Sequence, residues 1–232
     1  MTFEALRQEV LEANLELVRR GLVMYTFGNA SAIDRANGVV VIKPSGIPYE
    51  SMSADHMVVV DLDGKIVEGA LKPSSDLPTH LILYRNFQAI GGVAHTHSRC
   101  ATAFAQARTE IPCYGTTHAD YFYGPVPVTS PLLSSEIETD YEVNTGQAIV
   151  RRFQGLDAQS MPGVLVASHA PFTWGDTVAE AAYHAGILEE IAHLALCTTM
   201  ANPEAERISR ALLDKHFFRK HGGAAYYGQK KG

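Results

Sequence analysis

The sequence predicts a single α/β domain in which helices cover a central antiparallel or mixed sheet. Short valine-rich runs occupy residues 39–42, 56–61 and 65–67, and longer segments with helical spacing surround them. Asp63-Gly64 separates the last two runs in the way typical of a hairpin turn. Strands with helices on their faces form layered α/β folds. We therefore expect one domain over residues 1–232 without repeats or linkers.

The remaining elements can be assigned in chain order. Residues 3–20 carry apolar side chains at helical spacing and end at Gly21, which predicts an opening helix. Further helices are expected over about 77–87, from about 98, over about 178–197 and over about 205–221. The fourth of these five helices begins at Thr177-Val-Ala-Glu180, a capping box. Apolar runs before His97 and His169 predict two buried strands.

Composition excludes several classes of function. The chain is 46% hydrophobic and carries a formal net charge of -6, so no basic surface for nucleic acid is expected. It has no apolar run of the roughly twenty residues that span a bilayer, and no signal peptide is evident. Three widely spaced cysteines give neither a disulfide framework nor a thiolate zinc site. We expect a cytoplasmic protein with a small-molecule substrate.

Two histidines one residue apart, His95 and His97, suggest a metal site. Residues i and i+2 of a strand project from the same face, so their imidazoles should lie side by side. His169 ends a second apolar run and can supply a third imidazole. Three histidines with an open position suit catalysis. The alternative is that these are hydrogen-bonded core histidines.

Small and hydroxyl-bearing residues form three candidate oxyanion cradles. They are Gly28-Asn29, Lys43-Pro-Ser45-Gly46 and Ser74-Ser75. Each alone also fits ordinary turn chemistry. Asp76 follows at a predicted helix start, where it can cap the helix, bind a metal or act on a proton. His80 lies on the same helix face as Asp76, and we favour a packing role for His80.

Two further segments carry candidate proton-transfer groups. Asp120 lies among aromatic residues, which can shift the pKa of a carboxyl toward neutrality, although it can equally cap the turn before Gly124. The C-terminal stretch combines cations with Tyr226 and Tyr227, and a neighbouring subunit could anchor it. A solvated basic helix end is the alternative.

Six segments, spread over essentially the whole chain, carry motifs in a recognisable combination. They are Phe27-Gly-Asn29, Ile42-Lys-Pro-Ser-Gly46, Lys72-Pro-Ser-Ser-Asp76, His95-Thr-His97, residues 115–124 and Tyr226-Tyr-Gly-Gln229. Together they resemble the L-ribulose-5-phosphate 4-epimerase family of the class II aldolase superfamily. The resemblance implies a three-layer α/β/α sandwich around a mainly antiparallel sheet, assembled as a homotetramer with active sites at subunit interfaces. Phe27 stands where the family usually has tryptophan, and Ala170 where it usually has glycine.

The resemblance also implies roles for individual residues. His95, His97 and His169, with Asp76 beside them, would bind one divalent metal per subunit, usually Zn²⁺, although Mn²⁺, Co²⁺ and Ni²⁺ also suit such ligands. Substrate and phosphate would be held by Gly28, Asn29, Lys43, Ser45, Gly46, Ser74 and Ser75. Asp120 and Tyr227 would be the catalytic proton-transfer pair, supported by Glu142, His216 and Arg219.

The implied reaction converts L-ribulose 5-phosphate to D-xylulose 5-phosphate, in arabinose, ascorbate or related pentose metabolism. The hydrogen on carbon 4 is not adjacent to the carbonyl and is barely acidic, so inversion is expected through cleavage and re-formation of the bond between carbons 3 and 4. A metal would stabilise the enediolate fragment. The alternatives are a class II aldolase that releases both fragments and a non-catalytic metal-binding protein.

Overall fold

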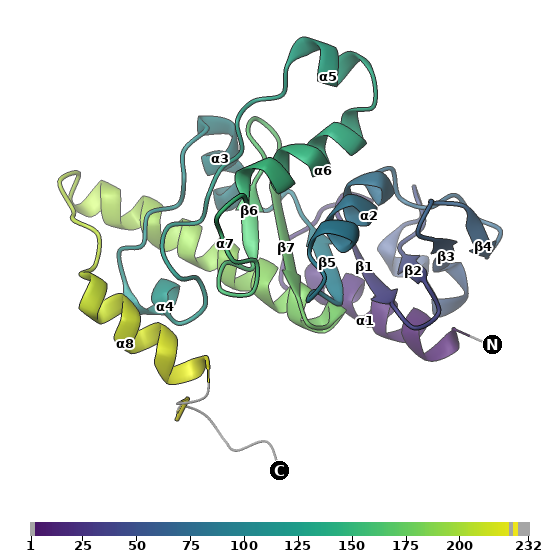
Figure 1. Ribbon diagram of the computed structural model, residues 1–232, viewed down its shortest axis with the longest axis horizontal. Coiled ribbons are helices and arrows are strands. Elements are labelled where there is room, and N and C mark those ends of the chain that lie inside the picture. Colours follow the sequence, from purple (N-terminus) through teal and green to yellow (C-terminus); the bar gives the residue numbers. More distant parts are fainter. Residues whose placement is uncertain (1–2, 223–224, 227–232) are drawn as a thin grey trace.

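The computed structural model describes residues 3–222 and 225–226. Seven strands form one sheet in the order β4-β3-β2-β1-β5-β7-β6, and every neighbouring pair is antiparallel. The strands are β1 (Asn29–Asp34), β2 (Val39–Ile42), β3 (Val58–Asp61), β4 (Ile66–Glu68), β5 (Gly92–His95), β6 (Gly163–Leu165) and β7 (Pro171–Gly175). The predicted antiparallel sheet is confirmed (Figure 1).

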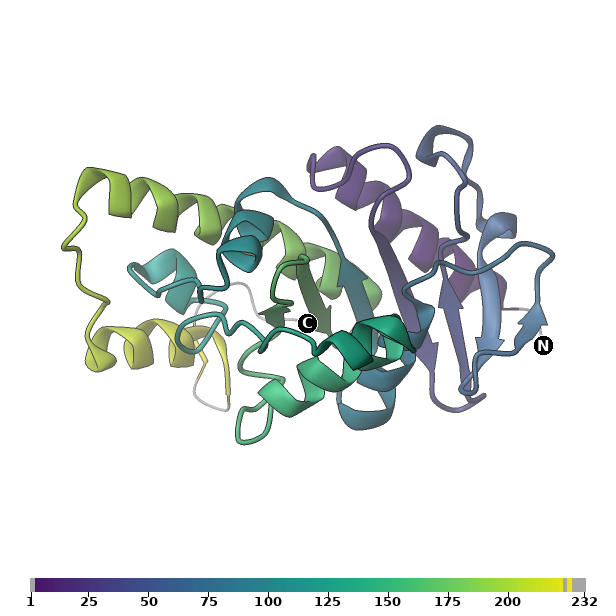
Figure 2. The same ribbon diagram turned by 90° about the horizontal axis from the view of Figure 1, so that it is seen from above.

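Helices cover both faces of this sheet. The described residues form the helices α1 (Glu4–Arg19), α2 (Leu77–Asn86), α3 (Arg99–Ala107), α4 (Thr116–Ala119), α5 (Ser134–Glu138), α6 (Tyr141–Arg152), α7 (Val178–Ala201) and α8 (Arg210–Lys220). Two 3₁₀ turns, η1 (Tyr49–Ser51) and η2 (Ala54–His56), precede β3. Figure 2 shows α1 and α7 on one side of the strands and α2 and α6 on the other, which is the expected three-layer arrangement.

The two faces of the sheet carry separate hydrophobic cores. Val39, Val41 and Val59 pack with α1 and the start of α7. Val40 and Val58 point toward the opposite face of the sheet. There they pack with the buried side chains of α2 and of the other elements on that face. Successive strand residues face opposite sides, so a strand covered on both faces is apolar throughout. This explains why the valine runs lack the alternation of a half-exposed strand.

Several element boundaries differ from the sequence-based expectation. β5 ends at His95, so His97 lies in the connection to α3 instead of on the strand. β6 ends at Leu165, and His169 lies in the turn before β7. The last helix begins at Arg210, well after residue 205, because the preceding segment lacks helical hydrogen bonds. Helix α6 was not predicted.

The capping box at the start of α7 is only partly formed. The Thr177 side chain accepts from the Glu180 backbone at 3.2 Å, as predicted. The Glu180 carboxylate, however, accepts from the Asp176 backbone instead of that of Thr177. Both acceptors still satisfy backbone donors at the helix entry. No helix within residues 3–222 is long and apolar enough to cross a membrane.

We expect two helical glycines to respond in opposite ways to alanine. A Cβ on Gly146 of α6 would lie 2.7 Å from Cβ of Ile82 on α2, so Gly146→Ala should lower the free energy of unfolding by about 1–3 kcal/mol. Gly186 of α7 has no atom within 4 Å of its would-be Cβ, so Gly186→Ala should raise it by up to about 1 kcal/mol. Urea denaturation measures both, and a neutral Gly146→Ala would contradict the tight α2–α6 contact.

Candidate metal centre and active site

Three histidine side chains from two separate chain segments meet beside the sheet. The Nε2 atoms of His95 and His97 lie 3.1 Å apart, and the ring of His169 lies 4.9 Å from that of His95. One ligand nitrogen from each of the three lies within 4.8 Å of the others. Nitrogen ligands around a tetrahedral zinc are about 3.3 Å apart. The donor set and its spacing therefore fit one divalent cation.

The position of His95 follows from the sheet. β5 pairs with β1 and β7 at once, which places Asn29 and Phe172 on either side of His95. The His95 ring stacks on Phe172 at 4.2 Å, and its Nδ1 lies 2.9 Å from the Pro171 carbonyl oxygen. Because a carbonyl can only accept, Nδ1 carries the hydrogen and Nε2 keeps its lone pair for a metal.

A tight turn between β6 and β7 positions His169. The backbone of His169 donates to Val166, and that of Val166 donates to Ala170. Ser168 is the left-handed residue of this turn, with φ of +61°, and its hydroxyl accepts from Arg108. Ala170 is not among the residues with positive φ. Alanine at that position therefore fits the turn without backbone strain.

The protonation states of the clustered imidazoles suit the binding of a cation. Burial, with the neighbouring imidazoles, lowers the pKa of His169 to about 4, and burial likewise lowers the pKa of His97. Both rings are therefore neutral at pH 7, which is the form that ligates metals. His80 is fully buried outside the cluster, its Nδ1 2.7 Å from the Ser31 hydroxyl. This agrees with the packing role expected for it.

Asp76 lies next to the cluster, at the N-terminus of α2. Its carboxylate accepts from the Asn29 side chain at 2.6 Å. Burial alone would raise the pKa of Asp76, but electrostatic interaction with the neighbouring His95 and His80 imidazoles and the hydrogen bond from Asn29 hold it below its usual value. Asp76 is thus an ionised carboxylate beside three imidazoles, suited either to a metal or to a proton.

Two loops form the proposed oxyanion cradle by pairing with each other. The backbone of Ser45 donates to Lys72, that of Ser74 donates to Lys43, and Pro44 and Pro73 form an antiparallel bridge. Asn29 donates to the Ser74 hydroxyl at 3.0 Å. This pairing brings residues 43–46 and 72–76, which are far apart in sequence, to one side of the histidines.

Gly28 completes the cradle, and no other residue fits there. Its φ is +71°, and a Cβ would lie 2.8 Å from the His95 carbonyl oxygen and 2.6 Å from the Val23 side chain. Lys43 is buried, and its ammonium donates to the Thr26 carbonyl at 3.1 Å. Burial lowers the pKa of Lys43 to about 8, against the opposing charge of Asp76. The side chain therefore remains largely protonated at pH 7.

These side chains share one cavity of about 400 Å³. It is lined by Thr26, Phe27, Gly28, Asn29, Lys43, Ser45, Gly46, Ser74, Ser75, Asp76, His95, His97, Tyr141, Glu142 and His169. The structure thus brings together all the metal and phosphate candidates and Glu142. Phe27 stands at the mouth, half exposed, with its ring 6.0 Å from that of His97.

Sequence reasoning missed two lining residues, Thr26 and Tyr141. The Tyr141 hydroxyl oxygen lies 3.3 Å from Nδ1 of His169. The residue begins α6, for which no motif gave a signal. The helical spacing of Thr145, Ala148 and Ile149, all buried, would have predicted that helix.

Helices α4 and α8 are neighbours (Figure 1). Asp120, His216 and Arg219 are gathered where these helices meet, and none of them lines the cavity. Arg219 donates twice to the Asp120 carboxylate, at 3.1 and 2.8 Å, and His216 lies 3.0 Å from it. Burial would raise the pKa of Asp120, but these bonds and the Lys220 charge lower it. In the isolated subunit, the expected shift of the Asp120 pKa toward neutrality is therefore wrong. Tyr227 lies outside the described residues.

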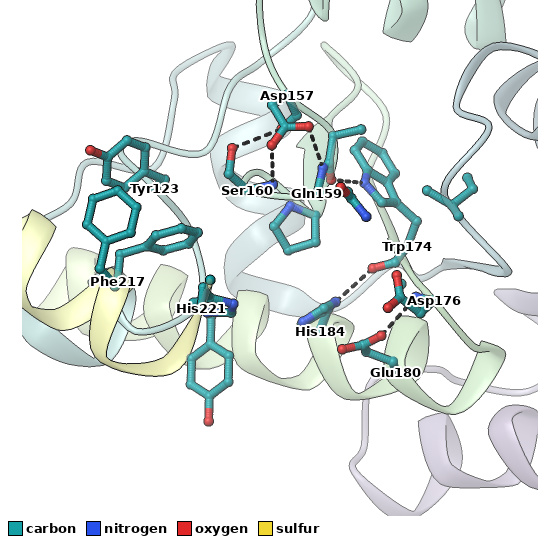
Figure 3. Close-up of a pocket in the computed structure, with 17 residues that line it drawn as sticks. Tyr123, Asp157, Gln159, Ser160, Trp174, Asp176, Glu180, His184, Phe217 and His221 are labelled. Carbon is teal, nitrogen blue, oxygen red and sulfur yellow. Dashed lines mark hydrogen bonds between the residues drawn. The ribbon is translucent and has the colours of Figure 1, made fainter. Parts of the chain in front are cut away.

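A larger cleft of about 650 Å³ lies on another part of the molecule, between α8 and the end of β7 (Figure 3). Its polar side chains mostly bond to the local backbone. His184 contacts the Trp174 carbonyl at 2.7 Å, Trp174 donates to Ala158, and Asp157 accepts from Ser160. None of the residues that the sequence singled out for metal or phosphate lines this cleft, which we regard as part of the scaffold.

Known proteins share this fold and sequence pattern. The profile of the Class II Aldolase and Adducin N-terminal domain family matches residues 8–196. An L-fuculose 1-phosphate aldolase is 25% identical, with a TM-score of 0.78 over 94% of this chain and 97% of the other. YgbL from Klebsiella pneumoniae, described as a putative aldolase/epimerase/decarboxylase, is 25% identical, with a TM-score of 0.71 over 93% and 99%. An L-fuculose-1-phosphate aldolase from Thermus thermophilus, 22% identical over 87% and 99% with a TM-score of 0.67, shares the fold.

We expect His97→Asn to weaken zinc binding by more than about 100-fold, since loss of a ligand should exceed the usual cost of losing a residue that supports one. The matched control is His193→Asn, at an exposed position on α7. Competition with a chromophoric chelator measures both affinities. Equal affinity in the two variants would mean that the cluster is not the metal site.

Proposed function

The chain belongs to the class II aldolase and adducin N-terminal domain family, and we propose that it is a metal-dependent epimerase of a ketopentose phosphate. The proposed reaction is inversion at carbon 4 of L-ribulose 5-phosphate, giving D-xylulose 5-phosphate. The observation that carries this proposal is the shared cavity, in which three imidazoles and a carboxylate face a cradle of backbone and hydroxyl donors. Such a cavity suits a substrate with adjacent oxygens at one end and a phosphate at the other.

The residues at each end of the cavity have distinct tasks. The three histidines, with Asp76 beside them, would hold one divalent cation, most suitably Zn²⁺, whose charge stabilises negative charge developing on substrate oxygens. Ser45, Ser74 and Ser75 would bind the phosphate, with the Lys43 charge nearby. Because the aldehyde fragment must rotate without escaping after cleavage, this phosphate grip is essential to epimerisation.

Asp120 and Tyr227 are the proposed proton-transfer pair. An epimerase needs a proton acceptor and donor on opposite faces of the aldehyde, whereas an aldolase needs one face only. His216 and Arg219 would orient the Asp120 carboxylate, as they do in this chain. Because Asp120 lies away from the cavity of its own subunit, we propose a homotetramer in which a neighbouring subunit supplies the pair.

The second candidate is a sugar-phosphate aldolase, which the two fuculose-phosphate aldolases among the similar structures favour. The same cavity would serve it. The sequence feature that separates the two is the Asp120 and Tyr227 pair, since release of both fragments does not require it.

A product assay separates these candidates. We expect incubation with L-ribulose 5-phosphate to give D-xylulose 5-phosphate, with loss of turnover on chelation and recovery with Zn²⁺. Chromatography of the products measures this, with His97→Asn as the inactive control. Accumulation of glycolaldehyde phosphate would favour the aldolase, and no conversion at all would contradict both.

Mixed oligomers test the shared site. His97→Asn and Asp120→Asn should each be inactive alone, because each lacks one half of every site. After the two are dissociated together and reassembled at random, about a quarter of the sites should combine two intact halves and recover activity. If no activity returns although mixed oligomers form, the site is not shared between subunits.

A further inference from the structure

Tyr141 occupies a position that the proposed reaction has not yet used. It begins α6 at the edge of the cavity, next to Glu142, and its side chain is half-buried. Its hydroxyl oxygen lies 3.3 Å from Nδ1 of His169, and the two rings are 6.0 Å apart. Among the described residues, Tyr141 is the side chain that lies within hydrogen-bond distance of a His169 ring nitrogen.

The packing of α6 fixes this contact. The Thr79 hydroxyl on α2 donates to the Glu142 carbonyl at 2.6 Å, so the first turn of α6 is tied to the first turn of α2. One turn later, Gly146 lets α6 approach Ile82 closely. The same helix α2 carries Asp76 at its N-terminus. The position of Tyr141 is therefore set by the same contacts that shape the metal side of the cavity.

The arrangement also determines where the hydrogen of His169 must lie. A neutral imidazole carries one N–H and one lone pair, and the nitrogen that binds a metal must present the lone pair. Nδ1 of His169 faces Tyr141, which leaves Nε2 for the position shared with His95 and His97. Nδ1 then carries the hydrogen and donates it to the tyrosine oxygen.

The tautomer of His95 is selected by a different hydrogen-bond partner. Its Nδ1 faces the Pro171 carbonyl, which accepts and cannot donate, so a single tautomer is allowed. A phenol can do either, but only acceptance leaves Nε2 of His169 unprotonated. The tyrosine hydrogen is then available to another acceptor in the cavity.

We infer that Tyr141 is a positioning residue for His169, with its hydroxyl oxygen accepting Nδ1–H and so turning the Nε2 lone pair toward the other two imidazoles. Residues in this role commonly contribute about 10- to 100-fold to metal affinity. The inference rests on the proposed metal centre, and it adds a residue to that site for which no sequence motif gave a signal.

The first test compares two tyrosine variants. Tyr141→Phe removes only the acceptor, and we expect it to weaken Zn²⁺ binding by about 10- to 100-fold in competition with a chelator. Tyr183→Phe is the matched control, because it removes a hydroxyl on α7 that bonds to Tyr121 and does not line the cavity. The control should bind Zn²⁺ as the parent does. Equal affinity in the parent and Tyr141→Phe would overturn the inference.

The second test needs no metal. Nitrogen-15 NMR of the metal-free parent protein, with His169 assigned by the signals lost in His169→Asn, reports which ring nitrogen is protonated. We expect Nδ1–H in the parent and a shift toward Nε2–H in Tyr141→Phe. Protonation at Nε2 in the parent would overturn the inference, even if Tyr141→Phe fails to fold.

The two tests also separate this inference from the proposed function. If the parent binds no Zn²⁺, the metal centre is wrong, and the NMR result still decides whether Tyr141 selects the tautomer. If the parent binds Zn²⁺ and Tyr141→Phe binds it equally well, the metal centre stands and the role of Tyr141 is wrong.

Discussion

The pairing of β5 with two antiparallel neighbours is the constraint on which the rest of the site depends. It places Asn29 on one side of His95 and Phe172 on the other. The strand ends that meet here then supply the remaining groups: the segment after His95 supplies His97, and the turn before β7 supplies His169. The His95 ring is held by stacking and by one carbonyl, so its free nitrogen has a fixed direction. A shift of one residue in the β1–β5 register would move Asn29 away from His95, and a shift in the β5–β7 register would move Phe172 away from it.

Much of the fold and most of the cavity could be predicted from the sequence, because the signals are local. The valine runs and the Asp63-Gly64 turn predicted the sheet, and the spacing of His95 and His97 predicted the cluster. The prediction that both lie on a strand was wrong, because β5 ends at His95, yet the two rings still lie 4.9 Å apart. Tyr141 could not be found this way. Its role depends on how α6 packs against α2, which is a long-range contact without a motif.

The Asp120 region shows a different limit of sequence reasoning. The aromatic neighbours suggested a raised pKa, but the decisive partners, Arg219 and His216, come from a helix about one hundred residues later in the chain. Their hydrogen bonds outweigh burial and hold the carboxylate ionised. An ionised carboxylate away from the cavity of its own subunit is understandable if it faces the cavity of another, where a substrate hydroxyl would complete its surroundings. The sequence implied active sites at subunit interfaces only through the family resemblance, and it left open which subunit supplies Asp120.

The central claim is that one divalent cation is bound by three imidazole nitrogens, and X-ray absorption spectroscopy of the zinc-loaded protein tests it most directly. The account predicts an inner shell with three histidine nitrogens at about 2.0–2.1 Å, completed by oxygen. A shell that contains sulfur at about 2.3 Å, or fewer than three imidazoles, would contradict it.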